Sequence, residues 1–266
     1  MQDLFSIKGK TALVPGGSRG IGEMIAAGFI SSGVKVYISS RKSEVCDATA
    51  DRLSHDFGGE CVSLPASISE LDGIESLVES LSAREEKLDI LINNAGAGWG
   101  APLEEFPEVG WDKVMDTNVK GMFFLIQKML PLLKASATAE DPARVINIGS
   151  IDGMVTPIFD NFSYGPSKAA AHHLTRVLAA HLVRDHINVN SIAPGPFPTW
   201  MLSTAVGMGG RTDGDWSQVA QRNPSRRVGT LEDIAGLAIF LSSRAGAYTV
   251  GETIACDGGA VASAHI

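Results

Sequence analysis

The sequence predicts an α/β fold: one domain built on a doubly wound parallel sheet of about seven strands, with helices on both faces. Short β-branched or apolar runs alternate with longer amphipathic segments along all 266 residues, the pattern of parallel strands joined by right-handed crossovers. No internal repeat or long linker divides the chain, so residues 1–266 are expected to form a single domain. In such sheets, ligands bind beyond the carboxyl ends of the strands.

Strands and helices are expected in strict alternation. The expected strands cover residues 11–14, 35–39, 60–64, 89–92, 144–148, 187–192 and 252–255. The expected helices cover residues 21–32, 43–57, 70–85, 111–133, 162–184 and 231–242. Thr230, followed by Glu232 and Asp233, resembles a capping box at the start of the last helix. Residues 194–224 are rich in Gly, Pro, Ser and Thr, which predicts a flexible lid over a substrate pocket, although an ordinary surface loop has the same composition.

Composition and charge exclude several other classes of protein. Hydrophobic residues make up 44% and charged residues 20%, which rules out a disordered or collagen-like chain. The formal net charge of -8 argues against a nucleic-acid partner, because phosphate neutralisation needs clustered cations. The most apolar stretch, residues 122–133, is shorter than the roughly 20 residues of a membrane span. With three widely spaced cysteines and no basic leader, the chain is expected to be a soluble cytoplasmic protein without a membrane partner.

A glycine-rich loop follows the first expected strand and precedes an amphipathic helix. Glycine suits this place because a pyrophosphate must approach backbone N–H groups closely, and a Cβ would obstruct it. The helix N-terminus adds N–H donors and partial positive charge. A glycine triplet alone is a weak signal, but its place within a β-α-β unit indicates a dinucleotide-binding loop. The residues expected to contact the dinucleotide here are Gly16, Ser18, Arg19, Gly20, Ile21 and Gly22.

The end of the second expected strand indicates which dinucleotide binds. Ser39, Ser40, Arg41 and Lys42 stand where NAD-selective sites carry a carboxylate for the ribose 2′-hydroxyl. A 2′-phosphate needs cations instead, and Arg41 together with Arg19 could grip it in a fork geometry. We therefore predict NADP(H) as the cofactor, with Ser40 and Arg41 in its binding site. The alternative is that these cations are only solvated.

Tyr164 and Lys168 lie four residues apart on an expected helix, so both project from one face. A neighbouring ammonium favours the phenolate, so Lys168 is expected to lower the pKa of Tyr164 from its ordinary value near 10. Ser150 follows the fifth expected strand, where its hydroxyl could bond a substrate carbonyl, and Asn118 lies on the preceding helix. Tyr-x-x-x-Lys alone is common, but its combination with Ser150, Asn118 and a nucleotide loop indicates an active site.

These residues give the chain a resemblance to the short-chain dehydrogenase/reductase family over essentially its whole length. The resemblance rests on Gly16, Gly20 and Gly22, on Asn93-Asn94-Ala95-Gly96, on Asn118, Ser150, Tyr164 and Lys168, and on Pro194-Gly195. It implies a Rossmann-like fold in which Tyr164 is the general acid/base and Ser150 positions the carbonyl oxygen. It also implies that Lys168 holds the nicotinamide ribose and tunes Tyr164, and that Asn118 anchors a water in a proton relay.

The same resemblance implies further cofactor contacts and an assembly. The additional residues expected to line the cofactor are Ser67, Asn94, Ala95, Gly96, Pro194, Gly195 and Thr199. Ser67 replaces an acidic residue common in the family, and Pro15 replaces its usual threonine, which indicates either weaker cofactor binding or neutral drift. Helices 111–133 and 162–184 form a subunit interface in the family, so a homotetramer is expected, with a homodimer next.

Several short segments narrow the resemblance. Residues 143–150, 164–170 and 186–190 are most similar to the 3-oxoacyl (β-ketoacyl) reductases, including the rhamnolipid-pathway type. The leading hypothesis is therefore NADPH-dependent reduction of a small-molecule ketone, of 3-oxoacyl type, to a secondary alcohol with Tyr164 as proton donor. One alternative is NAD(P)-dependent oxidation of a secondary alcohol on a steroid, cyclic or polyketide-like substrate. Another is a non-catalytic dinucleotide-binding scaffold.

Two further groups of side chains receive no firm role. His172 and His173 are adjacent on an expected helix, with no carboxylate or cysteine at metal-ligand spacing, so no metal site is predicted. Trp99, Phe159 and Trp200 follow strand ends or lie in the expected lid. They either form apolar pocket walls or simply pack.

Overall fold

One parallel sheet runs through the computed structural model, which describes residues 3–156 and 159–264. In this part of the chain, seven strands are arranged in the order β3-β2-β1-β4-β5-β6-β7, and every neighbouring pair is parallel. The strands are β1 (Thr11–Pro15), β2 (Lys35–Ser39), β3 (Cys61–Ser63), β4 (Ile90–Asn93), β5 (Ala143–Ile148), β6 (Ile187–Pro194) and β7 (Thr253–Cys256). The fold class predicted from the alternating pattern is confirmed.

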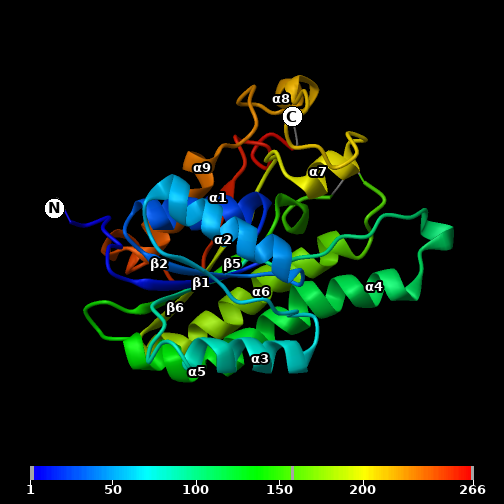
Figure 1. The fold of residues 1–266 in the computed structure, drawn as a ribbon. Coiled ribbons are helices and arrows are strands. Elements are labelled where there is room, and N and C mark those ends of the chain that lie inside the picture. Colours follow the sequence, from blue (N-terminus) through cyan, green and yellow to red (C-terminus); the bar gives the residue numbers. More distant parts are fainter. Residues whose placement is uncertain (1–2, 157–158, 265–266) are drawn as a thin grey trace.

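Helices cover both faces of the sheet, as Figure 1 shows. They are α1 (Gly20–Ser31), α2 (Ser43–Phe57), α3 (Leu71–Ser82), α4 (Glu108–Met115), α5 (Met122–Ser136), α6 (Tyr164–Leu182), α7 (Trp200–Ala205), α8 (Ser217–Arg222) and α9 (Leu231–Ser242). Helices α1, α2 and α9 lie on one face, and α3, α5 and α6 lie on the other (Figure 1). The molecule therefore has three layers, helix on sheet on helix.

Alternation along each strand divides the hydrophobic core in two. Ala12 and Val14 of β1 pack with α1, α2 and α9, whereas Leu13 between them packs with α3, α5 and α6. The same alternation places Ile90 and Ile92 of β4 on the first face. Because both faces are covered, β1, β4, β5 and β6 are buried along their whole length. This explains why most positions in these strands are apolar, although buried polar side chains such as Asn147 and Asn190 also occur.

The helix expected over residues 111–133 is interrupted. Helix α4 begins three residues earlier, at Glu108, and a π-helical turn, Asp116–Gly121, separates it from α5. Gly121 lies at the end of this turn, where a Cβ would come within 2.2 Å of the Ile68 carbonyl oxygen. The widened turn shifts which side chains face the sheet and brings Asn118 inward. Because Val119 is the one large apolar residue between Asp116 and Gly121, hydrophobic periodicity does not show this turn.

Other boundaries differ by smaller amounts. The segment 194–224, expected to be irregular, contains the short helices α7 and α8. The helix expected over 162–184 begins at Tyr164 and ends at Leu182, followed by a 3₁₀ turn. The capping box at α9 is confirmed, because the Asp233 carboxylate accepts a hydrogen bond of 2.9 Å from the amide of Thr230.

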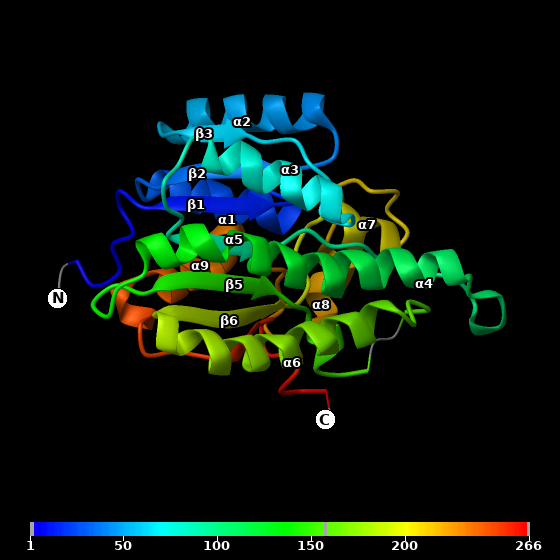
Figure 2. The ribbon, with the colours of Figure 1, turned by 90° about the horizontal axis from the view of Figure 1, so that it is seen from below.

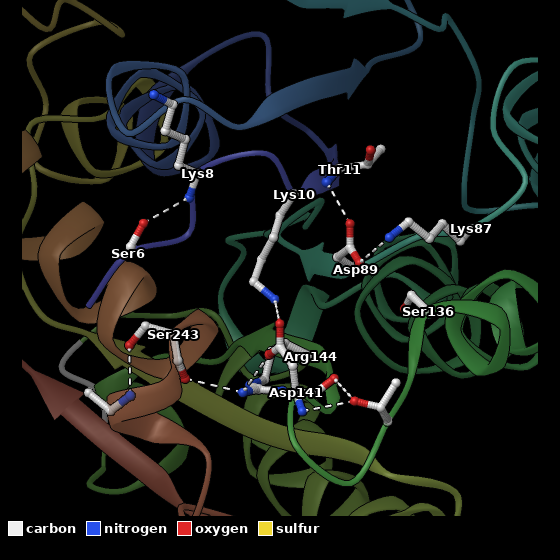
Figure 3. A network of polar contacts seen from close by, with 12 residues as sticks. Ser6, Lys8, Lys10, Thr11, Lys87, Asp89, Ser136, Asp141, Arg144 and Ser243 are labelled. Carbon is white, nitrogen blue, oxygen red and sulfur yellow. Dashed lines mark hydrogen bonds and ion pairs between the residues drawn. The ribbon is translucent and has the colours of Figure 1, made fainter. Parts of the chain in front are cut away.

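A polar network ties together segments at the amino ends of the strands (Figure 3). Arg144, at the start of β5, is 1% exposed and donates a hydrogen bond of 3.1 Å to the carbonyl of Ser243, just after α9. Its guanidinium also lies 3.5 Å from the Asp141 carboxylate, which in turn pairs with Lys10 ahead of β1. The network thus joins the amino ends of β1 and β5 to the end of α9. It lies away from the carboxyl ends of the strands.

The carboxyl ends of the strands face the other way, toward α7 (Figure 2). Strand β1 connects outward to β2, while β4 lies on its other side and continues toward β5. The order of strands therefore reverses between β1 and β4, and this switch point is where parallel α/β sheets form a ligand crevice. No helix in the described part of the chain is both long and apolar enough to cross a membrane.

Candidate active site

The loop after β1 turns tightly and touches the loop after β4. Gly16 and Gly20 have φ angles of 75° and 58°, in the left-handed region that glycine adopts without strain. A Cβ on Gly16 would lie 2.8 Å from the Cα of Ala95, and one on Gly22 would lie 2.3 Å from Nδ2 of Asn94. The Asn94 side chain donates a hydrogen bond of 3.0 Å to the Gly16 carbonyl. Glycine at these positions is what allows the two loops to meet.

The start of α1 fits the phosphates of a dinucleotide. Arg19, the N-cap residue, has no side-chain oxygen to cap the first-turn amides, so these N–H groups remain available to an anion. Ser18 is buried, and its carbonyl accepts a hydrogen bond of 3.2 Å from Thr49. Ile21 lies in the first turn of α1 and packs against the core. Backbone donors, tight glycines and a helix N-terminus together form the cradle that a pyrophosphate needs.

The segments predicted to hold the adenosine half follow β2 and β3. Ser40 comes directly after β2, and its hydroxyl donates a hydrogen bond of 3.3 Å to the Lys42 carbonyl. Arg41 and Lys42 are both exposed. Ser67, beyond the end of β3, shares a hydrogen bond of 2.9 Å with the hydroxyl of Ser69. The cofactor roles of these residues remain predictions.

Arg19 points toward the segment expected to form the lid. Its guanidinium lies over the indole of Trp200, 4.9 Å from the ring centroid, which is a cation–π contact. Trp200 in turn packs on Gly210, where a Cβ would come within 2.3 Å of the indole nitrogen. Thr199 caps α7 and lies beside Gly20, with its Cγ2 3.3 Å from where a Cβ would be. Residues 199 and 200 therefore cover the glycine-rich loop after β1. A fork of Arg19 and Arg41 around a 2′-phosphate stays a prediction.

Three of the predicted catalytic side chains lie at the carboxyl end of β5. Tyr164 is the first residue of α6, and Lys168 lies one turn later with its Nζ 5.5 Å from the centroid of the Tyr164 ring. The Lys168 ammonium donates a hydrogen bond of 2.8 Å to the carbonyl of Ile148, the last residue of β5. Ser150 lies two residues further on, and its Oγ accepts a hydrogen bond of 3.2 Å from the amide of Asp152. The Ser150 hydroxyl therefore keeps its own proton to donate.

The fourth, Asn118, lies in the π-helical turn and is 3% exposed. Its Oδ1 accepts a hydrogen bond of 2.8 Å from the Ala97 amide, and its Nδ2 donates to the Ala97 carbonyl and to Oγ of Ser167, both at 2.9 Å. The Ser167 hydroxyl donates to the Tyr164 carbonyl at 2.7 Å. Asn118 thus ties the loop after β4 to the helix that carries Tyr164 and Lys168. Its part in a water relay stays a prediction.

Loop residues on both sides of the sheet complete the predicted set. Asn94, Ala95 and Gly96 follow β4 directly, and a Cβ on Gly96 would lie 3.4 Å from the Asn118 side chain and 3.6 Å from the Lys168 ammonium. Pro194 is the last residue of β6, and the amide of Gly195 donates to the Cys256 carbonyl at 3.0 Å. The structure thus brings the loop after β4 against the side chains of Asn118 and Lys168, which are predicted to be catalytic.

The predicted effect of Lys168 on Tyr164 is wrong. The pKa of Tyr164 is raised to about 12, chiefly by burial and also by the Asp152 carboxylate, against a hydrogen bond from Ser150 that lowers it. Burial also lowers the pKa of Lys168 to about 8, opposed by the nearby Asp152. Loss of hydration is therefore the largest cause of both shifts. At neutral pH the phenol keeps its proton, and Lys168 is mostly charged.

Two residues without a predicted role lie beside this group. The Asp152 carboxylate lies near enough to Lys168 and Tyr164 to affect their charges, and burial raises the pKa of its own carboxyl. His172 is buried one turn beyond Lys168, and its Nε2 accepts a hydrogen bond of 3.4 Å from the amide of Ser150. The spacing of Tyr164, Lys168 and His172, four residues each time, was the available signal.

Other expectations have mixed outcomes. Trp99 packs on α4, where a Cβ on Gly110 would come within 2.7 Å of its ring and the Lys113 ammonium lies 5.1 Å from the ring centroid. The pocket role of Phe159 stays a prediction. Among the described residues, no group of three His, Cys, Asp or Glu side chains is placed to hold a metal ion.

Comparison with known proteins gives consistent matches along nearly the whole chain. A family model described as enoyl-(acyl carrier protein) reductase matches residues 16–261. The rhamnolipids biosynthesis 3-oxoacyl-[acyl-carrier-protein] reductase of Pseudomonas aeruginosa is 48% identical over 97% of this chain and 99% of its own length. Gluconate 5-dehydrogenase of Gluconobacter oxydans is 34% identical, covering 98% of each chain. A solved Pseudomonas aeruginosa RhlG/NADP active-site complex has a TM-score of 0.91 and 47% identity over 98% of this chain and 100% of that one.

Proposed function

Because the chain belongs to the short-chain dehydrogenase/reductase family, we propose that it uses NADPH to reduce a ketone of the 3-oxoacyl type to a secondary alcohol. The observation that carries the proposal is the Tyr164 side chain beside Lys168 and Ser150 at the carboxyl end of β5, where burial keeps the phenol protonated. A dinucleotide cradle lies at the adjoining switch point of the sheet. Carbonyl reduction needs both parts, a proton donor and a bound hydride source.

The residues present fit an NADP cofactor. NADPH, when bound, supplies the hydride that the carbonyl carbon accepts. The amides at the start of α1 are suited to its pyrophosphate, and Arg41 and Lys42 are suited to a 2′-phosphate because both are exposed cations after β2. Gly96 and Lys168, which lie close together, are placed to hold the nicotinamide half. The solved relative at 47% identity is described as an NADP complex, which supports this assignment.

The side chains at the site divide the work of proton transfer. As the substrate oxygen gains negative charge, the O–H bond of Tyr164 breaks and its proton passes to that oxygen. The Ser150 hydroxyl donates a hydrogen bond to the same oxygen and stabilises the developing charge. The Lys168 ammonium, held on the Ile148 carbonyl, lies close enough to stabilise the phenolate that remains. In the reverse reaction, alcohol oxidation, the Tyr164 phenolate would accept the proton of the alcohol.

Residues 194–224 are proposed as the lid of one domain spanning residues 1–266. Support comes from Trp200 and Thr199, which reach from this segment onto the phosphate loop. The relative at 48% identity is named as a 3-oxoacyl-[acyl-carrier-protein] reductase, which supports a 3-oxoacyl substrate.

A homotetramer in the cytoplasm is proposed for the assembly and location. Exposed apolar side chains on α4 and α6, namely Val109, Trp111 and Val177, support a subunit contact there. Three unpaired cysteines, Cys46, Cys61 and Cys256, suit a reducing compartment. A particle mass of one chain at micromolar concentration, measured by light scattering, would contradict the assembly.

A carbonyl panel tests the proposed function. The purified protein is incubated with NADPH or NADH and with 3-oxoacyl thioesters, cyclic ketones, a steroid ketone and a sugar ketone, and nicotinamide absorbance is followed. We expect turnover with 3-oxoacyl thioesters and a preference for NADPH. Tight cofactor binding with no turnover across the panel would instead favour a non-catalytic dinucleotide-binding scaffold.

A further inference from the structure

Polar contacts join one face of α6 to the carboxyl end of β5. The Lys168 ammonium donates to the Ile148 carbonyl at 2.8 Å, the Ser150 amide donates to Nε2 of His172 at 3.4 Å, and the Asn147 side chain donates to Oγ1 of Thr175 at 2.9 Å. Lys168, His172 and Thr175 are spaced by four and three residues, so they follow one stripe of the helix. Of the three side chains, only His172 bonds to the backbone of a residue predicted to be catalytic, Ser150.

The imidazole of His172 occupies a slot between two glycines. A Cβ on Gly149 would come within 2.0 Å of Nε2, and a Cβ on Gly153 would come within 2.9 Å of Cε1. His172 is 6% exposed, so the slot encloses its ring. Since Nε2 accepts the Ser150 amide, the neutral ring carries its proton on Nδ1. Burial and the Lys168 charge lower the pKa of His172 to about 4, which keeps it in this neutral form.

The bond to the Ser150 amide and the close packing on Gly153 place the imidazole against both ends of the 3₁₀ turn η3 (Ile151–Gly153). The same turn supplies the Asp152 amide that donates to Oγ of Ser150. Tyr164 lies on the same helix as His172, two turns before it. The imidazole is therefore a strut between the helix that carries the proton donor and the backbone that carries the Ser150 hydroxyl.

We propose that His172 is a positioning residue that sets Ser150 at the correct place relative to Tyr164, an inference that rests on the proposed reductase function. No other neutral side chain offers an acceptor and a donor on a flat ring thin enough for a slot walled by two glycines. The neighbouring His173 is exposed and lacks this environment. It therefore serves as a matched control on the same helix.

Amide hydrogen exchange tests the strut without relying on turnover. Exchange of the peptide covering residues 149–153 is measured by mass spectrometry in the wild type, His172→Leu, His172→Gln and His173→Leu. We expect exchange to rise about 10-fold in His172→Leu, because the Ser150 amide loses its acceptor, and to stay unchanged in His173→Leu. His172→Gln, which retains a donor and an acceptor, should recover part of the protection. Should His172→Leu fail to fold, the comparison of His172→Gln with His172→Asn, whose shorter side chain cannot reach, replaces it.

A double-mutant cycle with Ser150 tests the functional half. We expect His172→Leu to lower kcat on the order of 10- to 100-fold, the effect of a small displacement of a catalytic group, with the Kd for NADPH unchanged. In a Ser150→Ala background the same change should lower kcat less than about 2-fold, because there is no hydroxyl left to position. Equal losses in both backgrounds, or unchanged exchange of residues 149–153, would overturn the inference. A wild type that reduces no carbonyl would refute the proposed function, and the exchange experiment would still decide whether His172 holds this turn.

Discussion

Replacing Tyr164 with phenylalanine isolates the proton that the site is built to deliver. The change removes one oxygen and leaves the aromatic ring, so the packing at the start of α6 is preserved. Lys168 also stays in place, because its ammonium is held by the Ile148 carbonyl and not by the phenol. The variant should therefore fold normally and bind NADPH with an unchanged Kd.

The expected loss is large. A positioned general acid contributes roughly 10²- to 10⁴-fold to the rate, which is about 3 to 5.5 kcal/mol of activation free energy. The loss of kcat in Tyr164→Phe should fall in the upper half of this range. Tyr164 holds its proton at neutral pH, since its pKa is about 12, and Ser150 alone supplies only a hydrogen bond to the oxygen.

The other two tyrosines of the chain provide matched controls. Tyr248 is fully exposed, so Tyr248→Phe should leave both stability and kcat unchanged. The Tyr37 hydroxyl donates a hydrogen bond of 2.7 Å to Glu85 away from the site, so Tyr37→Phe should cost about 1 kcal/mol of unfolding free energy without changing kcat. All three variants are compared by steady-state NADPH oxidation with a saturating ketone and by denaturant unfolding. If Tyr164→Phe kept kcat within threefold of the wild type, the proton-donor assignment would be refuted.

Three further outcomes are expected. Gly22→Ala should weaken NADPH binding in calorimetry by about 10-fold or more, because its Cβ would lie 2.3 Å from the Asn94 side chain, whereas Gly236→Ala, with open space around it, should bind normally. The kcat/KM for reduction should fall as pH rises above about 8, where Lys168 loses its charge, and a profile that stays flat to pH 10 would contradict a role for the ammonium. Arg41→Ala should raise the KM for NADPH by roughly 10- to 100-fold and leave that for NADH unchanged, since a charge-assisted hydrogen bond contributes about 1.5 to 3 kcal/mol; equal effects on both cofactors would exclude contact with a 2′-phosphate.

The sheet and its order of elements could be predicted because burial on both faces leaves a direct mark on composition. Strands such as β1 and β4 are mostly apolar, and the segments between strands are amphipathic helices. The break between α4 and α5 could not be predicted in this way. A π-helical turn adds one residue to a turn, and its segment, Asp116–Gly121, is mostly polar, so hydrophobic periodicity does not reveal it.

The positions of Ser150 and Tyr164 could also be predicted, since Ser150 follows a strand end and Tyr164 opens a helix. Their electrostatics could not. Sequence spacing shows that Lys168 is near Tyr164, but it does not show how completely both are removed from water, and desolvation decides the direction of both pKa shifts. The contacts of His172 and Trp200 depend on segments distant in sequence, with Gly149 and Arg19 as partners. The sequence around His172 and Trp200 does not indicate these contacts.

The most direct measurement is a crystal structure of the protein with oxidised cofactor and an unreactive carbonyl analogue of a 3-oxoacyl thioester. We expect the Tyr164 hydroxyl oxygen to lie within about 3.2 Å of the carbonyl oxygen, with Oγ of Ser150 on the same atom. A Tyr164 oxygen too far away to reach that atom, even through one water, would contradict proton delivery by this side chain.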